Sequence, residues 1–154
     1  MMSPAQLLRE TEEYLAECGC GDAKIDAWYL YEYVFGTDRT QFMLERTEPY
    51  APEMQGKIDT YRQLAQRRGG GEPLQYITGE AWFMGLCFAV NPSVLIPRAD
   101  TEILAETALG QLREGESVLD LCTGSGCILL SLAKLGKPGR AVGADISAAA
   151  LETA

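Results

Sequence analysis

The stretch from Ser117 to Gly126 constrains the fold of this chain more than any other. It reads SVLDLCTGSG, a short apolar run of strand length followed by a turn with two glycines. The next residues, ILLSLA at 128–133, predict a helix. Strand, glycine turn and helix in this order are typical of an open parallel α/β sheet, where ligands bind at the carboxyl edge and meet the helix N-terminus.

A carboxylate follows at a distance that fits such a sheet. Asp145 comes directly after a short apolar run at 141–144 and lies 19 residues beyond Gly126. In nucleoside-binding βαβ units an acidic residue about 20 residues after the glycines binds the ribose, because one carboxylate accepts two hydroxyl protons. Two glycines alone would also fit a hairpin or a helix cap. Together with Asp145 they predict a nucleoside-binding crevice.

Composition excludes several classes of protein. The 154 residues are 47% apolar, enough for one sizeable core or two small ones. No stretch approaches the roughly 20 apolar residues of a membrane helix, and the first residues lack the features of a signal peptide. We therefore expect no membrane partner and a cytoplasmic location. The net charge of −9 gives no general attraction to a phosphate backbone, so no direct nucleic-acid partner is expected.

The cysteines do not predict a metal site. Their odd number, five, and their scattered positions indicate reduced thiols. Cys18 and Cys20 could form half of a zinc site, but the chain has no histidine and no second close pair to complete four ligands. We expect no metal.

Residues 1–71 predict a small bundle of helices. Ser3, Pro4 and Gln6 form a helix start of the capping-box type. Further starts are expected at Asp22, near Asp38 and at Pro52, and stops at Gly19, Gly36 and Gly69–Gly71. Tyr14 is expected in the buried stripe of the first helix. The aromatic residues of this half are expected to form a core rather than a ligand site.

The pattern changes after Gly71. Residues 72–79 predict a turn-rich connector, and residues 81–90 predict two strands folded about Gly85. A helix is expected from Arg98, capped by Asp100 or Thr101, with Ile103 and Leu104 on its inner side. A last helix is expected after Ser147. Because only two parallel strands are expected, whereas such sheets usually have about five or more, we expect this chain to be a fragment of a longer protein.

Four motifs together resemble the HemK/PrmC family of release-factor glutamine methyltransferases. The likeness covers essentially the whole chain and is strongest from Glu72 onward. The motifs are EPLQYITG at 72–79, FMGL at 83–86, VLIPRADTE at 94–102 and DLCTGSG at 120–126.

The resemblance implies a fold and a function. It implies a helical substrate-recognition domain at 1–71, a linker with a β-hairpin at 72–97, and the first βαβ unit of a Rossmann-like methyltransferase domain at 98–154. It also implies S-adenosylmethionine as cofactor and peptide chain release factors as partners. The family methylates the side-chain amide of the glutamine in their Gly-Gly-Gln motif.

The resemblance also assigns residues to the cofactor site. The residues that would line the methionine and ribose part are Cys122, Thr123, Gly124, Ser125 and Gly126. Asp145 would bind the ribose hydroxyls, with Asp120 beside the same site. Arg98 and Thr101 would help to close the pocket, although an ion pair of Arg98 with Glu102 at the helix start explains Arg98 equally well.

The chain departs from the family pattern in three ways. Ala99 stands where proline is common, and Cys122 where glycine is frequent, so we expect no positive φ at Cys122. The Asn-Pro-Pro-Tyr loop that holds the glutamine amide does not occur in these residues. Asn91-Pro92-Ser93-Val94 does not replace it, because the second proline and the aromatic ring are missing. We therefore assign no catalytic residue and expect these residues alone to be inactive.

Other classes of protein stay open. A nucleic-acid amino-methyltransferase would share the cofactor loop. An NAD-dependent dehydrogenase would use Asp145 in the same way, but Leu129 replaces the third glycine of its fingerprint. A non-catalytic module that binds a protein through its helical bundle is the alternative from outside enzymology.

Overall fold

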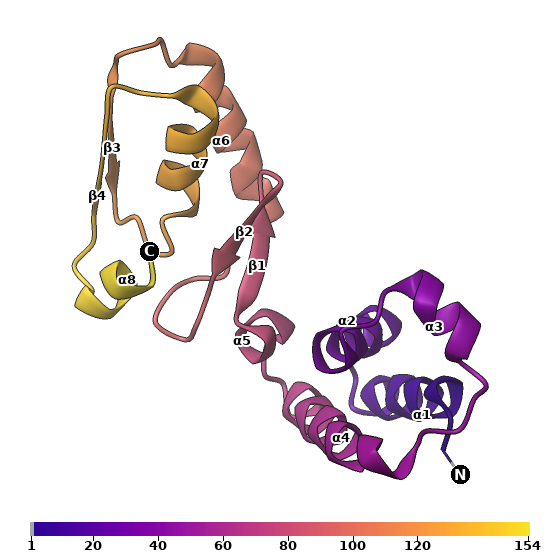
Figure 1. Cartoon of the computed structure of the whole chain (residues 1–154). Helices are drawn as coiled ribbons and strands as arrows, with labels where there is room; N and C mark the ends of the chain where they lie inside the picture. The colour runs from indigo at the N-terminus through magenta and orange to yellow at the C-terminus, as the bar shows by residue number, and fades with distance from the viewer. Residues whose placement is uncertain (1) are drawn as a thin grey trace. The chain divides into compact units, whose positions relative to one another are not determined.

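The computed structural model describes residues 2–154, which form two compact units (Figure 1). Unit 1 ends at Thr78, and unit 2 runs from Gly79 to Ala154. Unit 1 is helical. Its elements are α1 (Pro4–Glu17), α2 (Ala23–Phe35), α3 (Arg39–Glu45), the 3-10 helix η1 (Pro52–Met54), α4 (Gln55–Gly69) and α5 (Leu74–Thr78).

Local sequence explains most helix boundaries of unit 1. Ser3 and Gln6 form the expected capping box at the start of α1. The Asp38 carboxylate accepts the Gln41 N–H at 2.8 Å and begins α3. Gly36 ends α2 in the left-handed conformation, with φ of 67°. Asp22 occupies the N-cap position of α2, as predicted, but its side chain makes no capping hydrogen bond.

An aromatic core holds unit 1 together. Tyr31 stacks on Phe35 with ring centroids 4.4 Å apart, and Phe35 stacks on Tyr50. Tyr61 of α4 is fully buried and donates its hydroxyl to the Ala27 carbonyl of α2 at 3.0 Å. Burial raises the pKa of the Tyr61 hydroxyl above its ordinary value. The aromatic residues therefore form a core, as expected, although Tyr14 is partly exposed rather than buried.

Unit 2 begins with an antiparallel hairpin of β1 (Glu80–Phe83) and β2 (Leu86–Ala89). Phe83 pairs with Leu86, so the connecting turn consists of Met84 and Gly85, both with positive φ. Two such residues make the tight turn whose twist matches that of paired strands. The prediction of two strands folded about Gly85 is confirmed.

The rest of unit 2 combines helices with a parallel strand pair. Its elements are α6 (Ala99–Gln111), β3 (Ser117–Leu121), α7 (Cys127–Gly136), β4 (Arg140–Ala144) and α8 (Ala148–Thr153). β3 and β4 are parallel, with Ser117 opposite Arg140 and Leu121 opposite Ala144. Ser147 caps α8 by accepting the Ala150 N–H. The strand, glycine turn, helix and second strand thus follow in the expected order.

The structure differs from three sequence expectations in these segments. Residues 74–78 form α5 instead of an irregular connector, because Ile77 and Leu74 pack on the core of unit 1. Arg98, not Asp100 or Thr101, occupies the N-cap position of α6 and makes no side-chain cap. Ile103 and Leu104 are exposed, whereas Ala105 is the buried residue of α6.

The hairpin packs with the α/β segment that follows it. Phe83 and Phe88 form one buried cluster with Ala105 of α6 and Cys127 of α7. The division into 1–71, 72–97 and 98–154 stays a proposal beside the observed boundary between Thr78 and Gly79. Within residues 2–154, no helix has the length and apolar character needed to span a membrane.

Candidate functional site

The candidate site lies at the carboxyl edge of the parallel strand pair. Because Leu121 is opposite Ala144, the residues that follow each strand, Cys122 and Asp145, leave the sheet at the same edge. The Thr123 N–H donates to the Ala144 carbonyl at 3.0 Å and holds the two chain segments side by side. Parallel strands place the loops that bind ligands at this edge.

The loop at 122–126 turns sharply through left-handed backbone. Cys122, Gly124 and Gly126 have φ values of 63°, 55° and 73°. The expectation that Cys122 needs no positive φ is therefore wrong. The chain must turn out of β3 at this residue to bring Thr123 onto Ala144, and a cysteine adopts this conformation at a cost of about 1–2 kcal/mol.

The glycine loop and the carboxylate meet directly. Asp145 Oδ1 accepts the Ser147 N–H and Oδ2 accepts the Gly124 N–H, both at 2.9 Å. The Ser147 and Gly124 amides hold the pKa of the Asp145 carboxyl below its ordinary value. An ionised carboxylate has about four acceptor positions, so two remain after these bonds. That is the number needed for a pair of ribose hydroxyls.

A hydrogen bond from the last part of β3 fixes the Thr123 side chain of the loop. The Thr123 hydroxyl donates to Asp120 Oδ2 at 2.8 Å, and both Thr123 and Ser125 are buried. Asp120 therefore fixes the rotamer of Thr123 at the end of β3. Sequence reasoning proposed Asp120 and Thr123 for the site but did not find the bond between them.

The two loop glycines have different surroundings. A methyl group at Gly124 would meet no atom within 4 Å, whereas one at Gly126 would lie 3.1 Å from Ala154 Cβ and 3.2 Å from Leu130 Cδ1. Gly126 is thus enclosed by protein, and Gly124 faces open space. A ligand can approach the backbone closely at Gly124.

Gly143 is a residue of this region that sequence reasoning missed. A methyl group there would lie 2.9 Å from Leu129 Cδ2 and 3.2 Å from Thr123 Cγ2. Leu129 occupies the position of the third glycine in the dinucleotide fingerprint, which normally permits close helix–strand packing. Here the glycine lies in the strand instead of the helix: Gly143 of β4 leaves the space that the Leu129 side chain fills. A glycine inside a predicted strand was the available signal.

The structure does not bring Arg98 and Thr101 to the loop by any hydrogen bond or ion pair among the described residues. Arg98 Nη2 lies 3.5 Å from Asp100 Oδ2, and both side chains are exposed. The expected alternative, an ion pair of Arg98 with Glu102, is not formed, because Glu102 instead accepts the Met84 N–H at 2.7 Å. The Thr101 N–H donates to the Arg98 carbonyl as part of the helix start.

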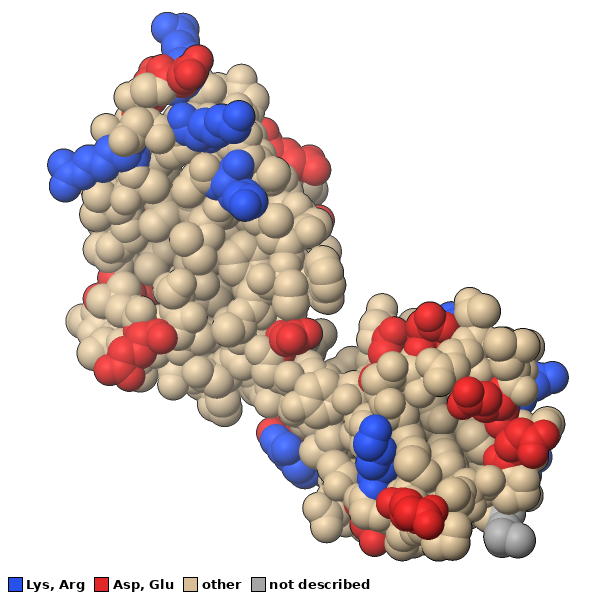
Figure 2. Space-filling model, viewed as in Figure 1, with Lys and Arg blue, Asp and Glu red and all other residues tan. Residues whose placement is uncertain are grey.

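The charge around the site is acidic. Figure 2 shows the Lys and Arg side chains on the visible face of unit 2 gathered at one end, together with some Asp and Glu, and only Asp and Glu at the other end. Asp120 and Asp145 follow the same polarity, because both lie at the carboxyl edge of the strands. An acidic edge suits a ligand that carries positive charge. Over residues 2–154, no three His, Cys, Asp or Glu side chains lie close enough to hold a metal ion.

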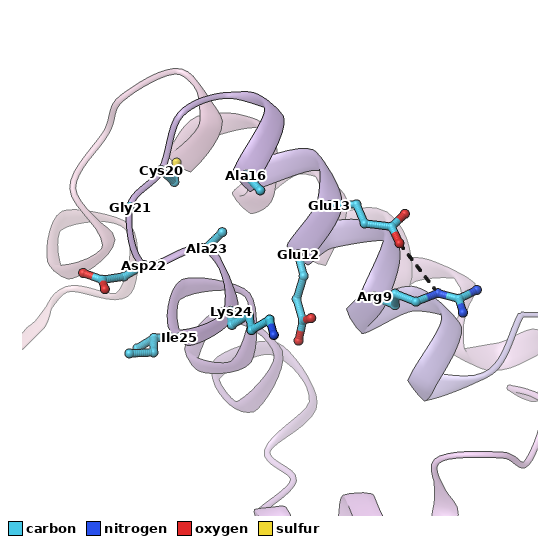
Figure 3. A pocket seen from close by; sticks show the side chains of 10 residues that line it. All are labelled: Arg9, Glu12, Glu13, Ala16, Cys20, Gly21, Asp22, Ala23, Lys24 and Ile25. Atoms are coloured by element: carbon cyan, nitrogen blue, oxygen red, sulfur yellow. Dashed lines mark ion pairs between the residues drawn. The ribbon is translucent and has the colours of Figure 1, made fainter.

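Unit 1 carries a separate hollow between α1 and the start of α2 (Figure 3). Its volume is about 650 Å³, and Glu12 and Lys24 point into the space between the helices. Arg9 and Glu13 form an exposed ion pair at 3.9 Å on its rim. It has neither a glycine loop nor a strand edge, so it is not a nucleoside site of the kind found in unit 2.

Fold and site together define a class of protein: a helical unit joined to an α/β unit whose glycine loop and acidic residue converge at one sheet edge. Residues 6–79 match the family model of the PrmC N-terminal domain.

Similar proteins extend the match over the rest of the chain. The release factor glutamine methyltransferase of Geobacter sulfurreducens is 40% identical over 97% of this chain and 51% of its own length. That of Bordetella pertussis is 47% identical over 87% of this chain and 49% of its own. That of Chlorobaculum tepidum is 38% identical over 99% of this chain and 53% of its own length. The chain therefore belongs to the PrmC family, and it spans about half the length of these curated relatives.

Proposed function

We propose that the protein containing these residues transfers a methyl group from S-adenosylmethionine to the glutamine side-chain amide in the Gly-Gly-Gln motif of peptide chain release factors. The observation that carries this proposal is the convergence of Gly124 and Asp145, joined by a hydrogen bond of 2.9 Å. The names of the relatives support the methyl transfer and the release factor as its target. We also propose a function in translation termination and a location in the cytoplasm.

The residues present suit this cofactor. We propose that Asp145 binds the ribose hydroxyls through its two remaining acceptor positions and that Gly124 lets the cofactor approach the backbone. Cys122, Thr123, Ser125 and Gly126 would surround the methionine part, with Asp120 orienting Thr123. Arg98 and Thr101 stay proposed for closing the pocket. The bound cofactor supplies an electrophilic methyl group on a cationic sulfur, which the acidic edge favours.

Methyl transfer to an amide nitrogen depends mainly on alignment and on acceptors for the amide protons. The described residues offer the cofactor half of this arrangement. The Asn-Pro-Pro-Tyr motif of the family does not occur in the sequence. We therefore propose that the 154 residues alone bind the cofactor but do not catalyse methyl transfer.

Unit 1 is proposed to bind the release factor. Ile25, Tyr29 and Tyr33 are spaced four residues apart on α2, and each is more than half exposed. Aromatic side chains on an exposed helix face are typical of protein interfaces. Binding of a release factor by this unit without cofactor would equally fit a non-catalytic module, so binding alone does not establish the enzyme.

Calorimetric titration with S-adenosylhomocysteine and, separately, with NAD tests the cofactor site. We expect S-adenosylhomocysteine to bind the chain. Asp145→Ala should lower the affinity by about 10–100-fold, because the variant loses charge-assisted hydrogen bonds to the ligand. Asp100→Ala, an exposed carboxylate on α6, is the matched control and should bind normally. Binding of NAD in place of the homocysteine ligand would contradict the proposal and favour a dehydrogenase.

Methyl-acceptor assays with a relative's full-length enzyme carrying this chain's residues 1–154 test the substrate. We expect labelled methyl groups on the release factor and none on DNA. Label on DNA but not on the release factor would favour a nucleic-acid amino-methyltransferase.

A further inference from the structure

The β1–β2 turn is held on α6 by one side chain. Glu102 Oε1 accepts the Met84 N–H at 2.7 Å. In a two-residue hairpin turn the N–H of the first turn residue has no partner within the hairpin. Glu102 therefore supplies an acceptor for the Met84 N–H, and the bond is strengthened because its acceptor is a carboxylate.

The same face of α6 makes the apolar contact with the hairpin. Ala105 lies three residues after Glu102, which places both on one side of the helix. Ala105 is fully buried in the cluster with Phe83 and Phe88, next to the turn. Hydrogen bond and apolar contact thus fix the hairpin at neighbouring points.

This cluster reaches the glycine loop. Its fourth member is Cys127, the first residue of α7, which directly follows Gly126. Burial raises the pKa of the Cys127 thiol above its ordinary value. The hairpin therefore helps to cover the start of α7, where the glycine loop ends.

The segment after the hairpin has a second attachment. Asn91 Nδ2 donates to Thr153 Oγ1 of α8 at 3.0 Å. The neighbouring Ala154 lies against Gly126, since a methyl group on that glycine would be 3.1 Å from Ala154 Cβ. The segment after β2 is thus tied to α8, next to the residue that borders the loop at Gly126.

Arg98 does not compete for Glu102. Its guanidinium lies 3.5 Å from Asp100, and the Glu102 carboxylate accepts the Met84 N–H instead. Asp100 and Glu102 lie two residues apart in the first turn of α6 but have different partners. This makes Asp100 a matched control for Glu102.

We propose that Glu102 is a positioning residue for the cofactor loop. By holding the Met84 N–H, its carboxylate keeps the hairpin packed on Cys127 and so keeps the start of α7 in the geometry that receives the adenosine ligand. The effect on the ligand rests on the proposed function, whereas the effect on Cys127 does not.

Two measurements on the 154-residue chain test the contact with the loop. In Glu102→Ala we expect hydrogen exchange of the Met84 amide to become about 10–100-fold faster, the range for one lost bond to a charged group. Alkylation of Cys127 should also accelerate, while that of Cys18 in unit 1 stays unchanged. Glu102→Gln keeps an acceptor oxygen and should restore both rates to within a few-fold, and Asp100→Ala should change neither.

Unchanged Met84 exchange or unchanged Cys127 alkylation in Glu102→Ala would overturn the proposal. So would equal acceleration in Glu102→Gln, because the acceptor oxygen would then have no effect. Far-ultraviolet circular dichroism of each variant identifies global unfolding, which would also count against a positioning role.

Titration with S-adenosylhomocysteine tests the consequence for the ligand. We expect the dissociation constant to rise about 3–10-fold in Glu102→Ala, with Glu102→Gln and Asp100→Ala near the original value. A normal dissociation constant together with fast Met84 exchange would show that the hydrogen bond between Glu102 and Met84, the clamp of the hairpin turn, does not position the loop. Failure of the unmodified chain to bind would count against the proposed function, and the Met84 and Cys127 rates would still decide whether the clamp exists.

Discussion

Unit 1 and unit 2 use their apolar side chains differently. In unit 1, nine buried residues form one cluster that includes Tyr61 at 0% exposure. In unit 2, Phe83, Phe88, Ala105 and Cys127 form a smaller buried cluster, and Leu129 and Leu132 of α7 are buried as well. Leu119 and Leu121 of β3 are 63% and 68% exposed, and Figure 2 shows a broad uncharged area on the visible face of unit 2.

This difference teaches how each unit is held in shape. Side-chain packing holds the helices of unit 1, where a partly buried ion pair between Arg68 and Asp26 at 2.7 Å adds a polar contact. Hydrogen bonds hold the candidate site of unit 2, at Thr123, Gly124 and Asp145. Substitutions in unit 1 should therefore affect mainly stability, and those at the loop should affect mainly binding.

The largest expected effect is in the core of unit 1. Tyr61→Ala should lower the free energy of unfolding of unit 1 by about 4 kcal/mol, because it removes a buried ring and a hydrogen bond to Ala27. Tyr33→Ala, at an exposed position of α2, should cost about 0.5 kcal/mol or less. Urea unfolding followed by near-ultraviolet circular dichroism measures both. Similar losses for the two variants would contradict a packing-based unit 1.

Substitutions of the two loop glycines should affect stability and ligand binding in opposite order. Gly126→Ala should destabilise unit 2 by about 2 kcal/mol, since the new methyl group is strained at positive φ and crowds Leu130 and Ala154. Gly124→Ala should cost about 1 kcal/mol, because its methyl group meets no protein atom.

The order is expected to reverse for the ligand. At equal folded fraction, Gly124→Ala should weaken S-adenosylhomocysteine binding more than Gly126→Ala, because only its methyl group enters the open space of the site. Urea unfolding and calorimetric titration of the same two variants check the pair. The same ranking in both measurements would contradict the assignment of that space to the ligand.

A smaller effect is expected at Cys122. Cys122→Gly should stabilise unit 2 by up to about 1 kcal/mol, because glycine removes the strain of positive φ but adds freedom to the unfolded chain. Cys122→Val should be destabilising, since a β-branched residue tolerates this conformation poorly. Thermal unfolding of the two variants measures the difference. A destabilising glycine would mean that the thiol has a role beyond its backbone position.

The smallest effect is expected from pH. Because the folded-state pKa of Asp145 is depressed, its contribution to stability is complete above the ordinary value of 3.8 and is lost as pH falls through the lower folded pKa. Unfolding of unit 2 measured from pH 7 to pH 2 should show that the stability difference between the native chain and Asp145→Asn shrinks in this acidic window. A difference that is constant with pH would exclude an ionised Asp145 bonded to Gly124 and Ser147.

Much of the fold could be predicted because short-range chemistry decides it. The capping box of Ser3 and Gln6, the stop at Gly36, the turn at Gly85 and the cap at Ser147 depend on residues within a few positions of one another. The same holds for strand, glycine turn and helix at 117–136. The meeting of Gly124 with Asp145 also followed from sequence, because parallel strands bring their carboxyl ends to one edge.

Other features required contacts between distant segments. The sequence could not show that Glu102 would choose Met84 over Arg98, because the hairpin turn is 18 residues away along the chain. Likewise α5 forms because Ile77 reaches the core of unit 1, and Gly143 is needed because Leu129 packs over it.

Sequence alone determined most of the helices and strands, α5 excepted, and which two loops share an edge, because periodicity, caps and strand direction are local or topological. Tertiary structure decided the backbone at Cys122, the partner of Glu102 and the remaining acceptor positions on Asp145. Each of these depends on which groups the packed chain leaves without a hydrogen-bond partner, and that becomes defined only when the segments are in contact.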